Sequence, residues 1–321
     1  MIVKPLSKPV FLEQLEVLKK RIPTAQPKRE EIIDTHARIS AGYAGEKALY
    51  SLLSKLPLDV DSRILFDLRL PLYENFHFQL DAVLLTKRYV LIFEVKNISG
   101  TSFLDGIHRQ LIRDKEGIQS GLPDPVSQAE RHRIHLSEWL LHHHFPSLPI
   151  DSLVVFTNRT SVIKSSPDYA DARLKTTRIE NLAASIKQIH ATHHNKAINS
   201  DDINRLTQLF LTHHSPYDPN ILERFSLTKE EIQIGVSCPS CGVIPMIRLY
   251  GKWSCKHCNE TSKVAHQAAF NDYKLLFSKK ICNKDARDFL LVQSRNTVKR
   301  LLSDMNLRSA GAKKNRYYFL E

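Results

Sequence analysis

Glycine is scarce in this chain of 321 residues, which has ten glycines and no cluster of them. A phosphate-cradling loop needs glycines at close, fixed spacings, so the sequence argues against an NTPase or a dinucleotide-binding enzyme. The Gly-x-Ser-x-Gly elbow of serine hydrolases is missing as well. No apolar run approaches the roughly 18 residues that a membrane-spanning helix requires. Pro5 and Pro9 interrupt the first ten residues, which lack the apolar core of a secretion signal. We therefore expect a cytoplasmic protein without a membrane partner.

The charge is basic and unevenly distributed. The formal net charge is +12 and the isoelectric point is near 9.4, whereas the hydrophobic share of 42% is ordinary for a globular protein. Residues 279–321 contain eleven Lys or Arg and four Asp or Glu, which is more than half of the excess. A polyanion is the natural partner of such a segment, with an affinity that falls as salt rises. We expect that partner to be nucleic acid, DNA in particular.

The order of helical and strand patterns predicts a mixed α/β core. Apolar residues recur at helical spacing over residues 42–56 and 126–143, and short apolar runs predict strands at residues 63–70, 78–86, 89–95 and 151–158. A strand and a helix at residues 174–190 complete the unit, which is a single domain. The expected organisation is an N-terminal arm or short helix (residues 1–35), the α/β domain (36–190), a helical connector (191–235), a four-cysteine module (236–262) and a basic helical domain (263–321).

Three charged residues lie in the most apolar part of the chain. Glu94 and Lys96 share one face of a strand because residues two apart point the same way. Pairing of the two predicted strands around Lys87 and Arg88 places Asp81 opposite Glu94. Neighbouring carboxylates need a cation when they are buried, and Mg²⁺ is a hard ion that prefers carboxylate oxygens. A lysine beside it can orient the attacking water. An ordinary salt bridge between Lys96 and a carboxylate is the alternative that spacing alone leaves open.

A wider set of motifs surrounds these residues. The motifs occur in the order Gly42-x-x-Gly45-Glu46, Gln79-Leu80-Asp81, Phe93-Glu94-Val95-Lys96-Asn97-x-x-Gly100, Asp124-Pro125-x-x-Gln128 and Val154-Val155-Phe156. In this order and at these spacings, residues 40–160 resemble the NERD (nuclease-related) domain family. The resemblance implies a restriction-endonuclease-like mixed sheet flanked by helices, of the PD-(D/E)xK type. It is the ordered set of motifs, more than any single one, that carries the likeness.

The resemblance also implies a site and a reaction. Glu46, Asp81 and Glu94 would bind Mg²⁺ or Mn²⁺, Lys96 would be the catalytic lysine, and Gln128 would be an accessory polar group. The implied reaction is hydrolysis of a phosphodiester bond, in which the metal polarises a phosphate oxygen and lowers the pKa of bound water. Ala82 follows Asp81 where members of the family often have a polar residue or histidine.

Four of the five cysteines form two Cys-x-x-Cys pairs. Cys238 and Cys241 are separated from Cys255 and Cys258 by thirteen residues. Two such knuckles close a tetrahedral Zn²⁺ site, and the residues around Gly251 between them are expected to form a hairpin. We interpret this segment as a zinc ribbon, with two redox-active dithiols as the alternative. A closed four-thiolate site is structural, so the ribbon can serve nucleic-acid binding or simple scaffolding.

The C-terminal segment contains an amphipathic basic helix. Val298, Leu301, Leu302 and Met305 share one face of residues 295–305, Ser294 is a suitable N-cap, and a basic turn leads to a final strand. This pattern resembles a winged-helix or helix-turn-helix unit, whose second helix enters the major groove. A packing unit with a solvated basic face is the alternative. The candidate nucleic-acid-binding residues are Arg295, Lys299, Arg300, Lys313, Lys314 and Arg316.

Clustered histidines at residues 142–144, 193–194 and 213–214 are expected to be solvent-exposed, because adjacent residues of a helix do not share a face.

The sequence is consistent with three alternative functions. The first is a metal-dependent nuclease acting on DNA, and the second is an inactive nucleic-acid-binding or regulatory protein that retains the nuclease fold. The third is an interaction scaffold in which the ribbon contacts protein. The sequence leaves oligomeric state, endo- or exonuclease action and biological pathway open.

Overall fold

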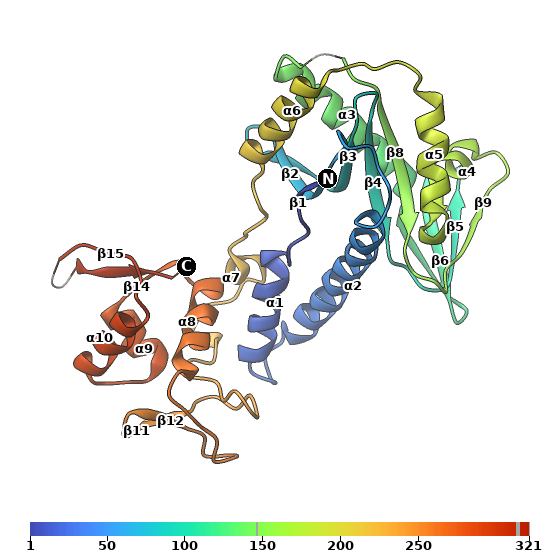
Figure 1. Ribbon diagram of the computed structural model, residues 1–321. Coiled ribbons are helices and arrows are strands. Elements are labelled where there is room, and N and C mark those ends of the chain that lie inside the picture. The colour runs from blue at the N-terminus through green and yellow to red at the C-terminus, as the bar shows by residue number, and fades with distance from the viewer. Residues whose placement is uncertain (146, 313–314, 321) are drawn as a thin grey trace. The chain divides into compact units, whose positions relative to one another are not determined.

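The computed structural model describes residues 1–145, 147–312 and 315–320 (Figure 1). The chain forms two compact units, and both are discontinuous in sequence. The first unit combines Met1–Lys8 with Ser40–Tyr217, and the second combines Pro9–Ile39 with Asp218–Glu321. The N-terminal segment therefore contributes to both units. The division into five segments that the sequence suggests stays a prediction about separable domains.

A six-stranded mixed sheet forms the centre of the first unit. The strand order is β1 (Ile2–Lys4), β2 (Arg63–Tyr73), β3 (Phe76–Leu85), β4 (Val90–Lys96), β8 (Ile150–Phe156) and β10 (Thr176–Arg178). The strands β2, β3 and β4 are antiparallel neighbours, whereas β1–β2, β4–β8 and β8–β10 are parallel pairs. The mixed α/β fold expected from the sequence is confirmed.

Helices cover both faces of this sheet (Figure 1). The helices α3 (Pro125–His142) and α6 (Ser200–His213) pack Trp139 and Phe210 against the face that contains Leu80. The helices α2 (Arg29–Leu53) and α5 (Leu182–Thr192) pack Leu49 and Ile186 against the opposite face. Burying apolar side chains on both faces explains why β3 and β4 are near-continuous apolar runs instead of alternating ones.

The hairpin of β3 and β4 has the expected register. Ala82 pairs with Phe93 and Leu85 with Val90, so that the next positions along the two strands are Asp81 and Glu94. The Val95 N–H donates to Oδ2 of Asp81 at 2.7 Å, which fixes this carboxylate at the end of the paired region. The pairing predicted around Lys87 and Arg88 is thereby confirmed.

A second sheet of the first unit was not predicted from the sequence. Its order is β7 (Ile118–Pro123), β6 (Gln110–Lys115), β5 (Thr101–Asp105) and β9 (Val162–Ser165), and α4 (Ala170–Lys175) follows. The residues of β7 are exposed or partly exposed, so their sequence lacks the apolar alternation that marks a half-buried strand. Residues 174 and 175, which were expected to begin a strand, are instead the end of α4, and the strand β10 begins at Thr176.

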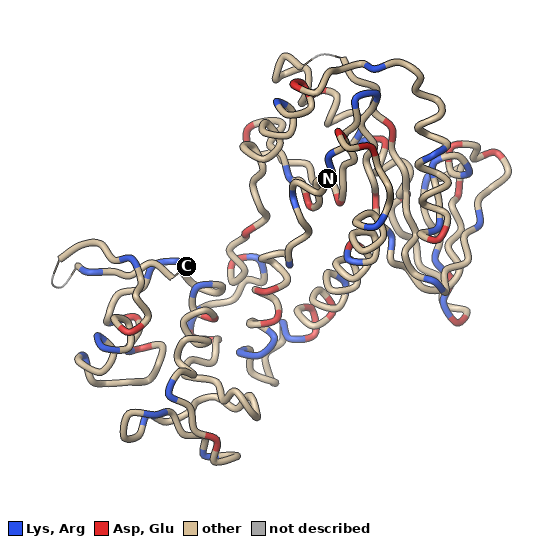
Figure 2. The backbone as a smooth tube through the Cα atoms, in the orientation of Figure 1, with Lys and Arg blue, Asp and Glu red and all other residues tan. Residues whose placement is uncertain are grey.

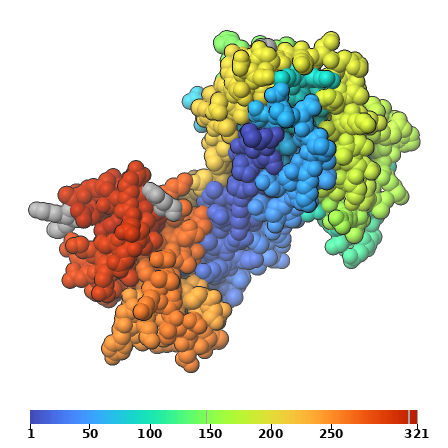
Figure 3. Space-filling view, viewed as in Figure 1, coloured from blue at the N-terminus to red at the C-terminus, as the bar shows by residue number. Residues whose placement is uncertain are grey.

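The second unit is built around the N-terminal helix. The helices α1 (Val10–Arg21), α7 (Ile221–Arg224) and α8 (Ala265–Leu276) share one apolar core, in which Leu15 and Leu18 are fully buried. The helices α1 and α8 lie side by side (Figures 1 and 3). The sequence allows either an arm or a short helix in residues 1–35. Residues Val10–Arg21 form a helix, and its apolar face is buried.

The rest of the second unit contains a ribbon and a winged-helix-like domain. The ribbon comprises β11 (Ile247–Leu249), β12 (Lys252–Ser254) and β13 (Thr261–Ser262), with the expected turn at Gly251, whose φ is 86°. After α8 come β14 (Lys280–Cys282), α9 (Asn283–Leu290), α10 (Arg295–Asp304), β15 (Ser309–Ala310) and β16 (Tyr317–Phe319). The last strand, β16, lies between β14 and β15, so three helices are combined with a small sheet that ends in a hairpin. No helix in the described part of the chain is both long and apolar enough to cross a membrane.

Candidate functional site

Helix α2 approaches β4 and β8 closely enough to bring Glu46 to the sheet. A Cβ at Gly45 would lie 2.8 Å from the Cβ of Asn97 and 2.9 Å from Oγ1 of Thr157, so this position has no room for a side chain. The Asn97 amide donates to the Ala41 carbonyl at 2.9 Å and holds the start of this segment of the helix. The glycine of the Gly42-x-x-Gly45-Glu46 motif therefore has a packing role.

Glu94 is the most buried charged group of the first site, with 2% of its surface exposed. Its Oε1 accepts from the Lys96 ammonium at 2.7 Å, and the same ammonium donates to Oε1 of Gln128 at 3.0 Å. Nδ1 of His132 lies 3.3 Å from Oε2, without hydrogen-bond geometry, so that Oε2 is buried with no hydrogen bond. Burial raises the pKa of Glu94, but the His132 imidazole and the Lys96 ammonium outweigh it and hold that pKa below its ordinary value.

The pKa values of the other two predicted acids, Glu46 and Asp81, are raised instead of lowered. Burial, followed by the charges of Asp67 and Glu94, raises the pKa of Glu46 to about 7. Burial, followed by the charges of Glu94 and Glu46, raises the pKa of Asp81 well above its usual range. Burial is the largest cause of both shifts, and repulsion among four carboxylates, which Lys4 and Lys96 do not balance, adds to it. A cation bound among these carboxylates would restore that balance.

Asp67 is a fourth acid of the site that sequence reasoning missed. The flanking pairs Phe66 with Ala82 and Leu68 with Leu80 place it across from Asp81, and its φ of 49° is left-handed. Its Oδ1 accepts from the Gln79 amide at 2.6 Å, and its carbonyl accepts from the Lys4 ammonium at 2.9 Å. A residue held in the left-handed region inside a strand stores backbone strain, which is common at functional sites. The signal available in the sequence was a single acid within an apolar strand.

His132 was also missed, although its spacing pointed to the site. It lies four residues after Gln128 on α3, and residues four apart share a helix face. The side chain of Asp124 caps this helix by accepting from the Ser127 N–H at 2.9 Å, and Pro125 occupies the first turn. The Asp124-Pro125-x-x-Gln128 motif therefore sets where α3 begins and which side chains reach Lys96.

Within the described residues, one group of three or more potential ligands has all its ligand atoms within 4.8 Å of one another, and it is the four thiols. The carboxylates of Glu46, Asp81 and Glu94 interact electrostatically but do not form so tight a group. They nevertheless suit a hard divalent ion, because Oε2 of Glu94 is buried without a hydrogen bond and the net charge is negative.

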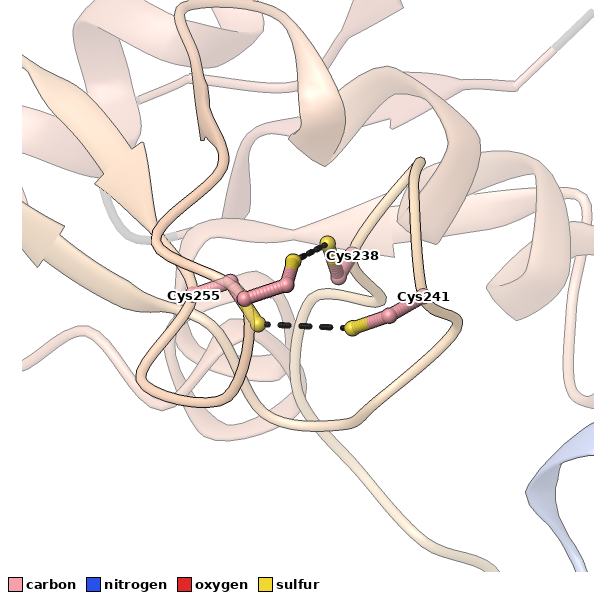
Figure 4. A group of neighbouring side chains, drawn as sticks. Cys238, Cys241 and Cys255 are labelled. Atoms are coloured by element: carbon pink, nitrogen blue, oxygen red, sulfur yellow. Dashed lines mark hydrogen bonds between the residues drawn. The ribbon is translucent and has the colours of Figure 1, made fainter.

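The four cysteines of the ribbon converge on a common centre (Figure 4). Sγ of Cys238 lies 3.6 Å from Sγ of Cys258, and Sγ of Cys241 lies 3.5 Å from Sγ of Cys255. The N–H groups of Cys258 and His257 hold the pKa of Cys255 at about 6. The Val243 N–H lowers the pKa of Cys241, but burial and the neighbouring thiols outweigh it and raise that pKa to about 12. Four thiolates so close need a cation, and this donor set suits zinc.

Three of the six predicted nucleic-acid-binding residues line one pocket of the second unit. Arg295 and Lys299 of α10 line an open pocket of about 560 Å³ together with Arg316, Lys284 and Arg287. Lys284 and Arg287 lie on α9 and were not predicted. Basic residues recur along α9 and α10 in Figure 2. The side chain of Ser294 accepts from the Thr297 N–H at 3.3 Å, so the predicted N-cap is confirmed.

Two further predicted residues, Lys313 and Lys314, lie outside the described residues. Arg300 is exposed but does not line the pocket, and its charge contributes to lowering the pKa of Arg248, after burial.

The expectation that the clustered histidines are solvent-exposed is wrong for several of them. The His143 ring stacks on Trp139 at a centroid distance of 3.9 Å, and His193 stacks on Tyr89 at 4.7 Å. Nδ1 of His214 accepts from the Arg69 N–H at 3.2 Å, and burial lowers the pKa of His214 to about 4. His142, His144 and His194 are exposed as expected, whereas both members of the His213–His214 pair are half-buried, and His213 lies edge-on to Trp139 at a centroid distance of 5.7 Å.

The fold and the two clusters define a class, namely an α/β nuclease-like domain combined with a four-thiol metal-binding module. Residues 41–157 match the sequence model of the nuclease-related domain, NERD. The resemblance inferred from the motifs is thus confirmed over the stretch that contains Glu46, Asp81, Glu94, Lys96 and Gln128. No curated protein matches the sequence.

A crystal structure of protein VC1899 from Vibrio cholerae is similar over 65% of this chain and 58% of that chain, at 10% sequence identity and a TM-score of 0.26. The chain thus spans less than two thirds of the length of that protein. A TM-score this low supports no argument about fold or function.

Proposed function

We propose that the first unit is a divalent-metal-dependent nuclease that hydrolyses DNA phosphodiester bonds. The observation that carries this proposal is the cluster of buried carboxylates beside Lys96 within a nuclease-related domain. The raised pKa values of Glu46 and Asp81 support it, because repulsion from neighbouring carboxylates adds to burial in raising them and a bound divalent cation would relieve that repulsion.

Each residue has a role in this proposal. Asp81 and Glu94 would hold Mg²⁺ or Mn²⁺ with Glu46 as a further ligand, and the ion when bound supplies Lewis acidity at a phosphate oxygen and lowers the pKa of water. Lys96 has three donors, of which Glu94 and Gln128 engage two. The remaining donor can orient the attacking water or a phosphate oxygen. Gln128 is a positioning residue that holds the ammonium in place.

The second unit assists binding in this proposal. The four thiolates would hold zinc as a structural centre that stabilises the ribbon. The surface formed by Arg295, Lys299 and Arg316 would contact the phosphate backbone. Charge reversal at Arg295 and Lys299 should weaken DNA binding and reduce the slope of log affinity against log salt by about two. An unchanged affinity and an unchanged salt slope would show that this basic face does not contact DNA.

A catalytically inactive nucleic-acid-binding protein that retains the nuclease fold is the second candidate. It is favoured by the spacing of the carboxylates, whose oxygens do not converge within 4.8 Å as the thiols do. Such a protein would bind DNA through the second unit and ignore divalent cations.

One assay separates the two candidates. Purified wild type, Glu94→Ala and Lys96→Ala are incubated with single-stranded, duplex and branched DNA in Mg²⁺, Mn²⁺ or chelator, and products are resolved by size. Asp171→Asn, an exposed acid of α4, is the matched control. We expect cleavage by wild type and the control in Mg²⁺ or Mn²⁺, and none by the other two variants. Cleavage that persists in Lys96→Ala, or that ignores chelator, contradicts the proposed mechanism.

A further inference from the structure

A pocket of about 360 Å³ opens beside the carboxylate–lysine site in the first unit. Asp81 and Gln128 form one part of its wall, and Phe76, His77, Arg131 and His135 form another. The site proposed for phosphodiester chemistry therefore continues into a surface of aromatic and basic side chains. That surface belongs to the tip of the β2–β3 hairpin and to the adjacent part of α3.

The rings of this surface are exposed yet held in place. Tyr73 is 52% exposed and Phe76 is 41% exposed. The Phe76 ring centroid lies 6.2 Å from that of Tyr73 and 5.3 Å from that of His135, with the His135 ring edge-on. We name Tyr73, Phe76 and His135 the aromatic ledge. Tyr73 and Phe76 pack only in part, so each presents ring surface to solvent that this chain does not cover.

The hairpin that carries the ledge is short and fixed. Tyr73 pairs with Phe76, the register shifts between Pro71 and Tyr73, and Asn75 has a left-handed φ of 64°, as in hairpin loops that end in a bulge. The Tyr73 hydroxyl donates to the Glu138 carboxylate, which ties the hairpin tip to α3. A ledge held in this way loses little conformational freedom when a flat ligand stacks on it.

We propose that the aromatic ledge stacks unpaired nucleobases of the strand whose backbone reaches the carboxylate–lysine site. This inference rests on the proposed nuclease function and specifies its substrate class: single-stranded segments, frayed ends or branches. Aromatic rings bind every base through its π-face, so stacking is tolerant of sequence. Inside a duplex the two faces of each base are covered by its neighbours. Only an unpaired or terminal base can offer a face to the ledge.

The neighbouring charges fit the same ligand. Arg131 lines the pocket beside His135 and supplies a guanidinium that can pair with phosphate or stack on a base. Asp81 and Gln128 lie in the same pocket, so a base on the ledge and a phosphate at the catalytic residues can belong to one strand. An apolar protein partner would not need the guanidinium or a pocket that Asp81 also lines.

Binding is tested separately from cleavage. The full-length chain is titrated, with Ca²⁺ in place of Mg²⁺, into a 12-nucleotide DNA strand that contains 2-aminopurine, alone and annealed to its complement. We expect the fluorescence of the single strand to be quenched on binding. Phe76→Ala should weaken binding of the single strand about tenfold, as expected for one stacked base, and change duplex binding less than twofold. Phe76→Trp retains a ring and should restore the affinity.

Two further variants complete the experiment. Ile118→Ala removes an apolar side chain that is 75% exposed on β7 and should leave both affinities unchanged. His135→Ala carries the same expectation as Phe76→Ala and replaces it if the latter does not fold. Equal losses for single strand and duplex, or no loss in either variant, overturn the inference and open the ledge to a protein partner.

A parallel cleavage assay in Mg²⁺ distinguishes the two levels of the proposal. If wild type cleaves nothing but ledge variants still lose single-strand affinity, the nuclease proposal fails and the ledge stands as a binding site. If wild type cleaves and the ledge variants bind single strands normally, the ledge fails alone.

Discussion

The two units of this protein differ in where their candidate functional charges lie, within the apolar interior or on the surface. In the first unit, Glu94, Asp81 and Lys96 lie within the apolar sheet, where burial raises the pKa of Asp81 while His132 and Lys96 outweigh burial and lower that of Glu94. In the second unit, Arg295 and Lys299 lie on an exposed face of α10. Buried charged groups suit catalysis because their surroundings shift their pKa values, whereas exposed positive charges attract a polyanion at long range. The difference separates a candidate reaction centre from a candidate docking surface.

The units also differ in how local their sites are. The thiol cluster spans Cys238 to Cys258, and the ligands of each pair are three positions apart. The carboxylate site draws on Lys4 of β1, Glu46 of α2, Glu94 of β4 and His132 of α3. A site assembled from distant segments depends on the whole fold, whereas a thiol site within one short segment would depend on the metal that it binds. Four predictions test this contrast, from the largest expected effect to the smallest.

Metal removal should unfold the ribbon and leave the first unit folded. Structural zinc in small thiolate sites contributes about 10–16 kcal/mol of apparent binding free energy. Each unit contains one tryptophan, Trp139 in the first and the fully buried Trp253 in the second. In Trp139→Phe, chelator or Cys255→Ser should shift the remaining emission to the red. In Trp253→Phe, chelator should leave the Trp139 emission unchanged. A bound metal content far below one zinc per chain would refute the site.

Breaking the buried ion pair of the second unit should have the next largest effect. Arg21 is fully buried, its Nε donates to Oδ2 of Asp272 at 2.8 Å, and its guanidinium also donates to the Gln233 and Gly235 carbonyls. Arg21→Ala leaves Asp272 without this partner and should cost about 3–5 kcal/mol in urea unfolding monitored through Trp253. Lys20→Ala is the control, since Lys20 is 35% exposed and lies 3.2 Å from the same oxygen. Equal losses in both variants would mean that burial is not the cause.

Acid should destabilise the second unit through His266. This side chain is 4% exposed, its Nδ1 accepts from the Trp253 indole N–H at 3.2 Å, and burial, followed by the Arg248 charge, lowers its pKa to about 4. The unfolded chain binds this proton near pH 6.5 and the folded chain only near pH 4. Stability is therefore full above pH 6.5 and is lost as pH falls toward 4, by roughly 2–3 kcal/mol.

The control for this pH dependence is His266→Asn, whose amide oxygen can accept from the same indole but cannot be protonated. The cysteine ligands also bind protons at low pH, so the relevant quantity is the difference in stability between wild type and this variant at each pH. A difference that stays constant between pH 7 and pH 4 would contradict the assignment to His266.

Substitution of Gly45 should test whether close packing of α2 supports the first site. Gly45→Ala places a Cβ 2.8 Å from that of Asn97 and should destabilise the first unit by about 1–3 kcal/mol. Gly42 lies on the same helix, and a Cβ added there would have no atom of the described residues within 4 Å. Gly42→Ala should therefore stabilise the first unit by roughly 0.5–1 kcal/mol through helix propensity. Urea unfolding monitored through Trp139 measures both. If Gly45→Ala stabilised the first unit as Gly42→Ala does, α2 could move away from Asn97 without loss of stability.

Much of the fold could be predicted because local patterns were strong. Apolar runs located β2, β3 and β4 to within a few residues, and their register followed from the turn at Lys87 and Arg88. The four-stranded sheet of β7, β6, β5 and β9 was missed because its strands are short and partly exposed, so no alternation marks them. The role of α1 as a core element was left open, because the surface against which it packs lies more than 200 residues away in sequence.

The sequence alone determined the parts that depend on residue type and short spacing. It determined the cluster of four cysteines, the Ser294 cap and the motif order that matches the nuclease-related domain. Tertiary structure alone decided which distant residues share an environment. It added Asp67 and His132 to the carboxylate site and placed the aromatic ledge beside it. The physical reason is that pKa shifts, close packing and pockets arise from neighbours in space, and one chain position does not encode its spatial neighbours.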